Sequence, residues 1–418
     1  MNKREFIRLV GGTSLGFTLA PDLLQRMTAA TPADLATDEK FWAAIRTHYR
    51  LTPDFIDLES GFYSMQAQPV LEAFIRHVRA VNFEATHYMR TVAVENKARV
   101  QARLAALAGC GADELIITRN TTESLDTVIA GFNWKPGDEA VMASHDYGAM
   151  LEQFALQARR FGMVNRVVNL PLHPKSDEEI VRHYAEAITP RTRLLHVSHV
   201  VNLTGQVLPV KAIATMAHAR GVEVVCDGAH AFAQLDYRIP ELGVDYYGAS
   251  LHKWLGCPLG AGILYVRRDR IAKLWPLYGD ITPADDIRKL NHTGTHPVHT
   301  DLAIEDAIAF HEMIGAARKE ARLRFLQHYW TSRVRGRPHL IVNTPADPAR
   351  TCAIGNVAVD GLTAAELARR LMEEHRIWTV AIDRPAAGVQ GVRVTPQVFT
   401  TTGDLDALVT ALTRIAAA

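Results

Sequence analysis

The 418-residue chain lacks the marks of several large classes of protein. Its cysteines show no CxxC spacing, which argues against a structural zinc site and gives no disulfide framework; the four are Cys110, Cys226, Cys257 and Cys352. With 46 basic and 45 acidic residues, it is not expected to have a nucleic-acid or membrane-surface partner. No apolar run approaches the roughly 20 residues of a membrane-spanning helix. The composition is that of a globular protein with room for two domains.

Residues 1–30 form a segment of their own. Basic Lys3 and Arg4 precede a short, weakly apolar stretch, Leu9–Ala20, and small residues cluster at residues 28–30. This layout is typical of an export signal and is too short to span a membrane. It resembles a twin-arginine signal with lysine in place of the first arginine, and predicts a periplasmic protein exported after folding. The alternative is an amphipathic N-terminal helix on a cytoplasmic protein.

Between residues 113 and 266, short apolar runs alternate with amphipathic segments. The runs are rich in Val, Ile and Leu, as in strands buried on both faces, and comprise Leu115–Thr118, Ala140–Ala143, Arg166–Leu170, Leu194–Ser198, Val222–Asp227 and Gly262–Val266. Strands that alternate with helices predict an α/β fold with a mostly parallel sheet. We expect residues 31–300 to form an N-terminal segment and one large domain.

The pattern changes at about residue 301. A long helical stretch is followed by a second alternation, with strands expected at Ala353–Val359 and Ile377–Ile382 and helices at Asp301–Gln327, Thr363–His375 and Asp404–Ile415. We expect residues 301–418 to form a smaller C-terminal α/β domain. Residues that precede the large domain are expected to join it.

The most informative segment runs from Ser250 to Trp254 and contains His252 and Lys253. A lysine among Trp, Leu, Gly and Pro is not typical of a solvated surface. Desolvation lowers the pKa of an amine, which suits it to attack an aldehyde as the free base. Taken alone, the segment is equally compatible with a buried lysine capped by hydroxyl groups.

Asp227 ends an apolar run, and His230 follows three residues later. Ligands of α/β sheets bind outside the carboxyl ends of the strands, where Asp227 is expected. An aspartate there can keep a pyridine nitrogen protonated and make the ring an electron sink. His230 could reach the phenolic oxygen of such a ring, or Lys253. The alternative is that Asp227 caps a turn and His230 is a satisfied core histidine.

Two hydroxyl residues, Thr121 and Thr122, open a predicted helix directly after the strand Leu115–Thr118. A helix N-terminus with unpaired N–H groups is a site for phosphate, although a threonine N-cap is also common. After the next strand comes Tyr147, whose ring could stack on a planar cofactor or serve as ordinary packing.

Taken in chain order, these residues resemble the class V aminotransferases, over about residues 58–399. The resemblance implies the pyridoxal 5'-phosphate (PLP) fold type I, in a homodimer with active sites at the interface. It implies that Lys253 carries PLP as a Schiff base, with Asp227 at the pyridine nitrogen and His230 beside the phenolic oxygen.

The resemblance also implies the remaining contacts of the site. The position of the family's carboxylate-binding arginine falls on Arg393, whose planar guanidinium suits a carboxylate. The resemblance implies that the phosphate is bound by Ser250, His252, Thr121 and Thr122. It also implies that Tyr147 stacks on the cofactor ring and that Asn202 contacts the ring oxygen.

Departures from the family pattern narrow the activity. Cysteine desulfurases carry a catalytic cysteine shortly before the C-terminal arginine, and residues 377–392 contain none, so desulfuration is not expected. The His-Asp-Tyr-Gly segment at residues 145–148 and the N-terminal segment look most like the isopenicillin N epimerase-like branch.

Three histidines, His292, His296 and His299, lie close together in the sequence. Gly294 and Pro297 break the helix that would bring two of them to one face, so no metal site is expected.

Three residues are further candidates for the mouth of the site. In the family, the stretch that contains Thr295 lies near the cofactor of the partner subunit, which makes this residue a candidate phosphate contact. Tyr88 and Arg90 could line the substrate entrance, or belong to a packed helix end.

The combined prediction is a PLP enzyme that acts on an amino acid or an amino-acid-containing small molecule. Lys253 would remove the Cα proton as general base. We rank transamination first, with epimerisation or elimination as the alternative. A non-catalytic, exported binding protein on a PLP fold is the alternative of another class. Such a protein would be expected to lose Lys253 or Asp227 first, and both are present.

Overall fold

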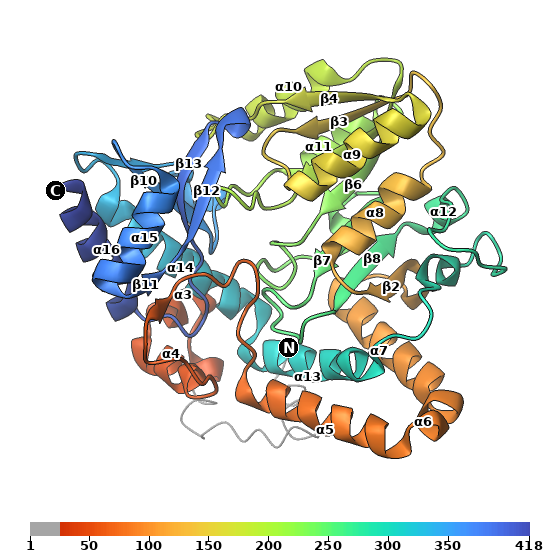
Figure 1. Ribbon diagram of the computed structural model, residues 1–418, viewed down its shortest axis with the longest axis horizontal. Helices are drawn as coiled ribbons and strands as arrows, with labels where there is room; N and C mark the ends of the chain where they lie inside the picture. Colours follow the sequence, from red (N-terminus) through yellow and green to blue (C-terminus); the bar gives the residue numbers. More distant parts are fainter. Residues whose placement is uncertain (1–25) are drawn as a thin grey trace.

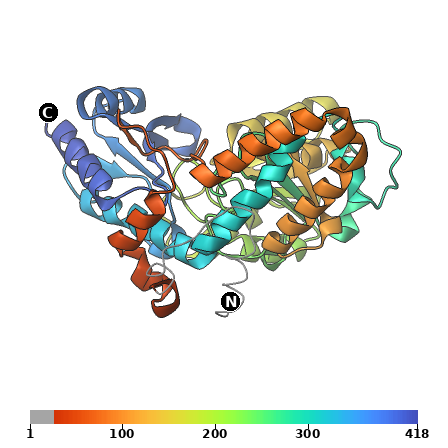
Figure 2. The same ribbon diagram turned by 90° about the horizontal axis from the view of Figure 1, so that it is seen from below.

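The computed structural model describes residues 26–418 (Figures 1 and 2). The predicted export signal, residues 1–30, therefore lies almost entirely outside the described residues. Among the helices of residues 26–418, none has both the length and the apolar character needed to cross a membrane.

A seven-stranded sheet forms the centre of the larger part of the molecule, in the order β2-β8-β7-β6-β5-β3-β4. Neighbouring strands run parallel, except that β8 is antiparallel to both β2 and β7. The strands are β2 Leu115–Thr118, β3 Glu139–Ala143, β4 Val164–Val168, β5 Thr192–Ser198, β6 Glu223–Asp227, β7 Tyr246–Ser250 and β8 Gly262–Val266. This confirms the α/β class, the mostly parallel sheet and the predicted strand positions to within two residues. β7 is an additional strand that the apolar pattern did not predict.

Helices cover both faces of this sheet because successive strand residues point to opposite sides. Ile117 packs into one core with helices α7 (Ala93–Ala108), α10 (Asp177–Ala187) and α11 (Val210–His218). Its neighbour Ile116 packs into another core with α8 (Thr121–Gly131) and α9 (Gly148–Phe161). Both faces are therefore buried, which explains the continuous apolar runs of the strands.

The C-terminal part contains an antiparallel sheet in the order β12-β13-β10-β9 (Figure 1, blue). Its elements are β9 Leu340–Val342, β10 Gly355–Val359, α15 Ala364–His375, β12 Val380–Arg384, β13 Val389–Val394 and α16 Thr402–Ala416. The strand predicted at residues 377–382 is divided between β11 (Ile377–Trp378) and β12. β11 pairs in parallel with β1 (Ile56–Asp57), so residues before the large sheet join this part, as expected.

The predicted helical stretch at residues 301–327 consists of two helices, α13 (Val298–Ile314) and α14 (Ala316–Val334). They meet at Gly315, whose φ of 89° lies outside the helical region and is readily adopted only by glycine. α13 runs beside α5 (Gln68–Glu84) under the large sheet (Figure 2). Its Ile304 and Phe310 belong to the same core as that sheet, and the division at residue 300 stays a prediction.

The remaining helices lie before the large sheet or along its edge. They are short, and comprise α3 Pro32–Ala36, α4 Glu39–Arg46, α6 Thr86–Thr91 and α12 Arg268–Ile271.

Candidate active site

A cavity of about 320 Å³ lies where the carboxyl ends of the parallel strands meet. Its volume is at the lower end of the range of small-molecule sites. Nine residues predicted to bind the cofactor line it, together with Arg393; the nine are Thr121, Thr122, Tyr147, Asn202, Asp227, His230, Ser250, His252 and Lys253. Five strands that are far apart in the chain thus deliver the predicted residues to one place.

Lys253 follows β7 and faces His230, which follows β6. The lysine Nζ lies 3.2 Å from His230 Nε2. On the other side of the imidazole, Trp254 Nε1 donates a hydrogen bond of 3.4 Å to Nδ1. Because Nδ1 accepts a hydrogen bond from the indole, a neutral His230 carries its own proton on Nε2 and donates a hydrogen bond toward Lys253. Only an uncharged lysine can accept that hydrogen bond.

Burial shifts both groups toward their uncharged forms. Burial lowers the pKa of Lys253 to about 8, against the opposing charge of Asp227. Burial, followed by the charge of Lys253, also holds the pKa of His230 well below its usual value. A hydrogen bond from a neutral imidazole to a free amine is consistent with both shifts. The predicted free-base lysine therefore has a physical basis in this site.

Asp227 ends β6 at the base of the cavity and is buried. Its Oδ1 accepts a hydrogen bond of 2.9 Å from Ala229 N, which fixes the carboxylate. Burial raises the pKa of this carboxyl, while the nearby His196 and Lys253 oppose that shift. Among the described residues no arginine or lysine forms an ion pair with Asp227, so Oδ2 can serve a ligand that carries a proton.

The N-terminus of α8 and the end of β7 form a hydroxyl-lined end of the cavity. Ser250 Oγ accepts a hydrogen bond of 2.9 Å from Thr121 N and lies 2.7 Å from Thr121 Oγ1. A side chain on Gly248 would meet Leu125 of α8 at 2.8 Å, so glycine allows the helix to approach the strand. The helix N-terminus and hydroxyls provide the donors that a phosphate needs.

The residues predicted to contact the cofactor ring lie at the rim and in the wall of the cavity. Tyr147, the N-cap of α9, is 42% exposed and lines the mouth of the cavity. The preceding loop is fixed by Asp146, which accepts hydrogen bonds of 2.8 Å from Ala143 N and from Ser198 Oγ. Asn202 lies on the opposite loop, after β5. These positions are compatible with the predicted contacts, which stay predictions.

Arg393 lies in β13 and reaches the cavity from the C-terminal sheet. Its guanidinium forms an ion pair with Glu59, at 2.5 Å between Nη2 and Oε1 and 3.2 Å between Nε and Oε2. Glu59 was not predicted, because no local motif marks it. Its contact with Arg393 spans 334 residues and depends on the pairing of Glu59 with Thr395.

Four candidate groups do not join the cavity lining. Tyr88 is buried in a small apolar cluster with Val298 and Leu302. Arg90 is exposed on α6, so its role in substrate binding stays a prediction, as does that of Thr295 in phosphate binding. The histidines near residue 295 have separate partners: His292 lies 3.2 Å from Asp280, His296 lies 2.9 Å from Asp301, and His299 packs against the ring of Phe74.

A larger surface cavity of about 850 Å³ lies elsewhere, around Trp275 and Tyr278. It contains none of the predicted site residues. A large volume by itself does not indicate a catalytic function, so the smaller cavity is the candidate active site.

The residues of the smaller cavity fit PLP. The cofactor requires an amine for attachment, an acid for the pyridine nitrogen and donors for a phosphate. Lys253, the free oxygen of Asp227, and the hydroxyl groups at the start of α8 provide them in one cavity.

Comparison with known proteins supports this assignment. The model of the family "Aminotransferase class-V" matches residues 64–387. An isopenicillin N epimerase of Streptomyces clavuligerus is 30% identical over 84% of this chain and 89% of its own length. The apo structure of a cysteine desulfurase from Thermococcus onnurineus NA1 superimposes with a TM-score of 0.80, at 19% identity, over 90% of this chain and 98% of that chain.

A second solved structure has the same fold with its cofactor in place. A C-DES mutant with glycine covalently linked to PLP superimposes with a TM-score of 0.79, at 22% identity, over 88% of this chain and 98% of that chain. The chain thus has the PLP fold type I, and it belongs to the class V aminotransferase family, in the isopenicillin N epimerase-like branch.

Proposed function

We propose that the chain is a PLP-dependent aminotransferase acting on an amino acid or an amino-acid-containing small molecule, with Lys253 as the attachment residue. PLP is the cofactor of this family and fold. The observation that carries the proposal is the contact of 3.2 Å between Lys253 and His230, in a cavity that also holds Asp227 and the hydroxyl-lined end of α8.

Each of the three central residues of the site has its own chemical role. When bound, PLP draws electrons from the carbon that carries the substrate amine. Asp227 would hold a proton at the pyridine nitrogen, because a buried carboxylate that pairs with no described arginine or lysine favours a proton donor. Lys253, as a free amine, accepts the proton from the substrate carbon, and His230 keeps it oriented.

Transamination and epimerisation differ in whether that proton returns to the substrate carbon. Lys253 and His230 touch each other, which supports proton transfer on one side of the substrate and therefore transamination. Epimerisation is the second candidate, because the chain is 30% identical to an isopenicillin N epimerase. Elimination requires a leaving group on the adjoining carbon of the substrate.

The reaction can be identified by incubating the holoenzyme with amino acids in D₂O. Transamination predicts a keto acid and an aminated cofactor. Epimerisation instead predicts deuterium at Cα and loss of optical activity without a keto acid. The aminotransferase proposal would be rejected if deuterium entered the substrate and no keto acid formed.

We further propose that the enzyme works as a homodimer. Phe62 and Leu259, at the mouth of the cavity, are 73% and 60% exposed, and a second copy would cover them. Light scattering coupled to size-exclusion chromatography should give twice the monomer mass; a monomer that retains full activity would contradict this.

We also propose that the enzyme is exported after folding. A cofactor held between two sheets is most simply loaded in the cytoplasm, and the sequence of residues 1–30 has the layout of a twin-arginine signal. Mass spectrometry of enzyme from its native host should find a mature chain beginning shortly after Ala30. Detection of intact residues 1–20 would overturn this proposal.

A further inference from the structure

The guanidinium of Arg393 is engaged by protein groups on every nitrogen. Nε and Nη2 donate to the two oxygens of Glu59, and Nη1 donates to Asn202 O at 3.2 Å. A guanidinium has five N–H donors, so three are used and two remain. Glu59 occupies the Nε–Nη2 edge of the guanidinium, one of the edges through which an arginine can bind a carboxylate with two parallel bonds.

The fold holds Glu59 in this position. Thr395 N donates to Leu58 O at 2.7 Å and Ser60 N donates to Thr395 O, which places Glu59 beside β13. Its carboxylate also accepts hydrogen bonds from Phe62 N at 3.0 Å and from Thr395 Oγ1 at 3.3 Å. The side chains of Arg393 and Glu59 are only 8% and 6% exposed. The pair is therefore part of the cavity wall and not a mobile surface contact.

The second arginine of the cavity is also paired. Arg119 Nη2 lies 3.0 Å from Glu123 Oε1. Of the described residues that line the cavity, both arginines thus have a carboxylate partner before any substrate binds.

We propose that Glu59 is a specificity-determining residue, which makes the site prefer amino compounds whose carboxyl group is masked as an amide or ester over free amino acids. The proposal rests on the proposed PLP-dependent function and narrows its substrate class to amino-acid-containing molecules without a free α-carboxylate.

The physical reason is the charge at the occupied edge of the guanidinium. A free carboxylate at Arg393 must either lie beside the carboxylate of Glu59, where like charges repel, or displace it. Displacement would leave a buried Glu59 without its cation, which is strongly unfavourable. The carbonyl of an amide or ester brings no charge and can accept a bond from the two N–H donors that remain.

The test compares the binding of two probes that differ only in this group, 2-aminoisobutyrate and 2-aminoisobutyramide. Neither has a Cα hydrogen, so binding is measured without turnover, from the shift of the cofactor absorption band. Holoenzyme, Glu59→Gln and Glu312→Gln are titrated with each probe. Glu312 pairs with Arg103 of α7, outside the cavity. Glu312→Gln is therefore the control, because it removes the carboxylate partner of an arginine that does not line the site.

Wild-type enzyme and Glu312→Gln should bind the amide about tenfold more tightly than the free acid. Glu59→Gln should bind the acid about tenfold more tightly than wild type does, with affinity for the amide nearly unchanged. A wild-type preference for the acid, or a ratio that Glu59→Gln does not move, would overturn the role of Glu59.

Borohydride reduction of the same protein preparations, before any probe is added, separates this failure from that of the proposed function. Cofactor fixed to Lys253 with an unmoved ratio refutes only the role of Glu59. Absence of fixed cofactor refutes the PLP-dependent function and, with it, the inference that rests on it.

Discussion

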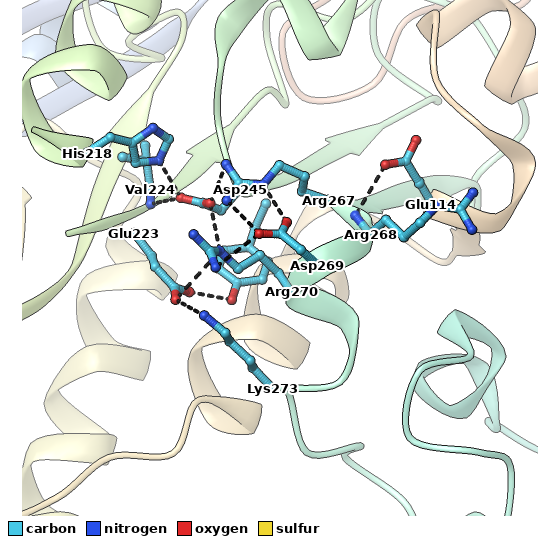
Figure 3. A network of polar contacts seen from close by, with 11 residues as sticks. Glu114, His218, Glu223, Val224, Asp245, Arg267, Arg268, Asp269, Arg270 and Lys273 are labelled. Carbon is cyan, nitrogen blue, oxygen red and sulfur yellow. Dashed lines mark hydrogen bonds and ion pairs between the residues drawn. The ribbon is translucent and has the colours of Figure 1, made fainter. Parts of the chain in front are cut away.

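Two buried aspartates lie at opposite ends of neighbouring strands of the large sheet and have very different surroundings. Asp245, directly before β7, accepts hydrogen bonds from His218 at 2.7 Å and Val224 N at 2.8 Å (Figure 3). It also pairs with Arg267 and Arg270, each at 2.9 Å. The carboxylate of Asp227, at the end of β6, accepts one hydrogen bond from the described residues, donated by a backbone amide.

The cluster around Asp245 is extended by its partners. Arg267 also binds Asp269 at 2.6 Å, and Lys273 binds Glu223 at 3.2 Å (Figure 3). It connects β6, β7 and α12 at the amino end of the strands. Each buried oxygen there has a donor, as expected for a group that stabilises the fold.

The comparison indicates that groups that stabilise the fold and groups available for the reaction lie at opposite ends of the strands. Charges at the amino edge are satisfied within the protein. At the carboxyl ends of the strands, no described arginine or lysine forms an ion pair with Asp227, and burial lowers the pKa of Lys253 to about 8. Groups whose burial is not compensated destabilise the apoprotein and remain available to a ligand.

Lys253→Ala should have the largest effect on function. Loss of the attachment residue and base should reduce turnover by on the order of 10⁴-fold. Below pH 8 the folded protein disfavours the protonated amine, so its removal should leave the apoprotein at least as stable at pH 7. Steady-state kinetics and denaturant unfolding measure the two effects. Turnover within tenfold of wild type would show that another residue acts as the base.

The pH dependence of cofactor attachment follows from the same shift. The free amine is the reactive form, so the rate at which apoprotein takes up PLP should rise with pH and level off above about 8. Stopped-flow absorbance measures this rate. A rate that rises until pH 10 would indicate an ordinary, solvated lysine.

Asp227→Asn should have the next largest effect. Without a carboxylate at the pyridine nitrogen, turnover should fall by about 10³-fold, while PLP remains bound. Because burial raises the pKa of Asp227, the ionised carboxylate destabilises the fold at pH 7, and the variant should not melt below wild type. A lowered melting temperature with near-normal turnover would show that Asp227, like Asp245, stabilises the fold and does not serve the reaction.

Asp245→Asn should affect stability instead of chemistry. Removal of the charge between Arg267 and Arg270 should lower the free energy of unfolding by about 3 kcal/mol. Turnover of the folded fraction should stay within twofold of wild type. Asp269→Asn removes a more exposed carboxylate of the same cluster and should have little effect on stability. Equal losses in the two variants would contradict the special position of Asp245.

Trp254→Phe should have the smallest effect. It removes the N–H that fixes the proton of His230 on Nε2 and should slow turnover about tenfold, with little loss of stability. Nitrogen-15 NMR of His230 in the apoprotein should change from one tautomer to a mixture. Trp330→Phe is the control, since no described residue accepts a hydrogen bond from this buried indole. A single, unchanged tautomer in Trp254→Phe would exclude the positioning role.

Much of this arrangement could be predicted from the sequence. The strands that deliver Thr121, Asp227 and Asn202 are aliphatic runs, and the polar residues after them must meet at one edge of a parallel sheet. β7 was missed because its sequence, Tyr-Tyr-Gly-Ala-Ser, is only partly aliphatic. Gly248 is small there because α8 packs against it, and this tertiary requirement leaves no apolar pattern.

The contacts between distant segments could not be predicted in this way. Glu59 reaches Arg393 only because two backbone segments pair across 334 residues. The bond from Trp254 to His230 depends on the conformation of the turn after β7. Local patterns therefore identified the chemical groups of the site, but not the partners that set their charge and orientation.

The most direct test of the account is to reduce the holoenzyme with borohydride and to map the modified peptide by mass spectrometry. The account predicts one pyridoxyl-modified residue, Lys253, and no modification in Lys253→Ala. Modification of any other lysine, or of the Lys253→Ala protein to the same extent, would contradict the assignment of Lys253 as the cofactor-bearing residue.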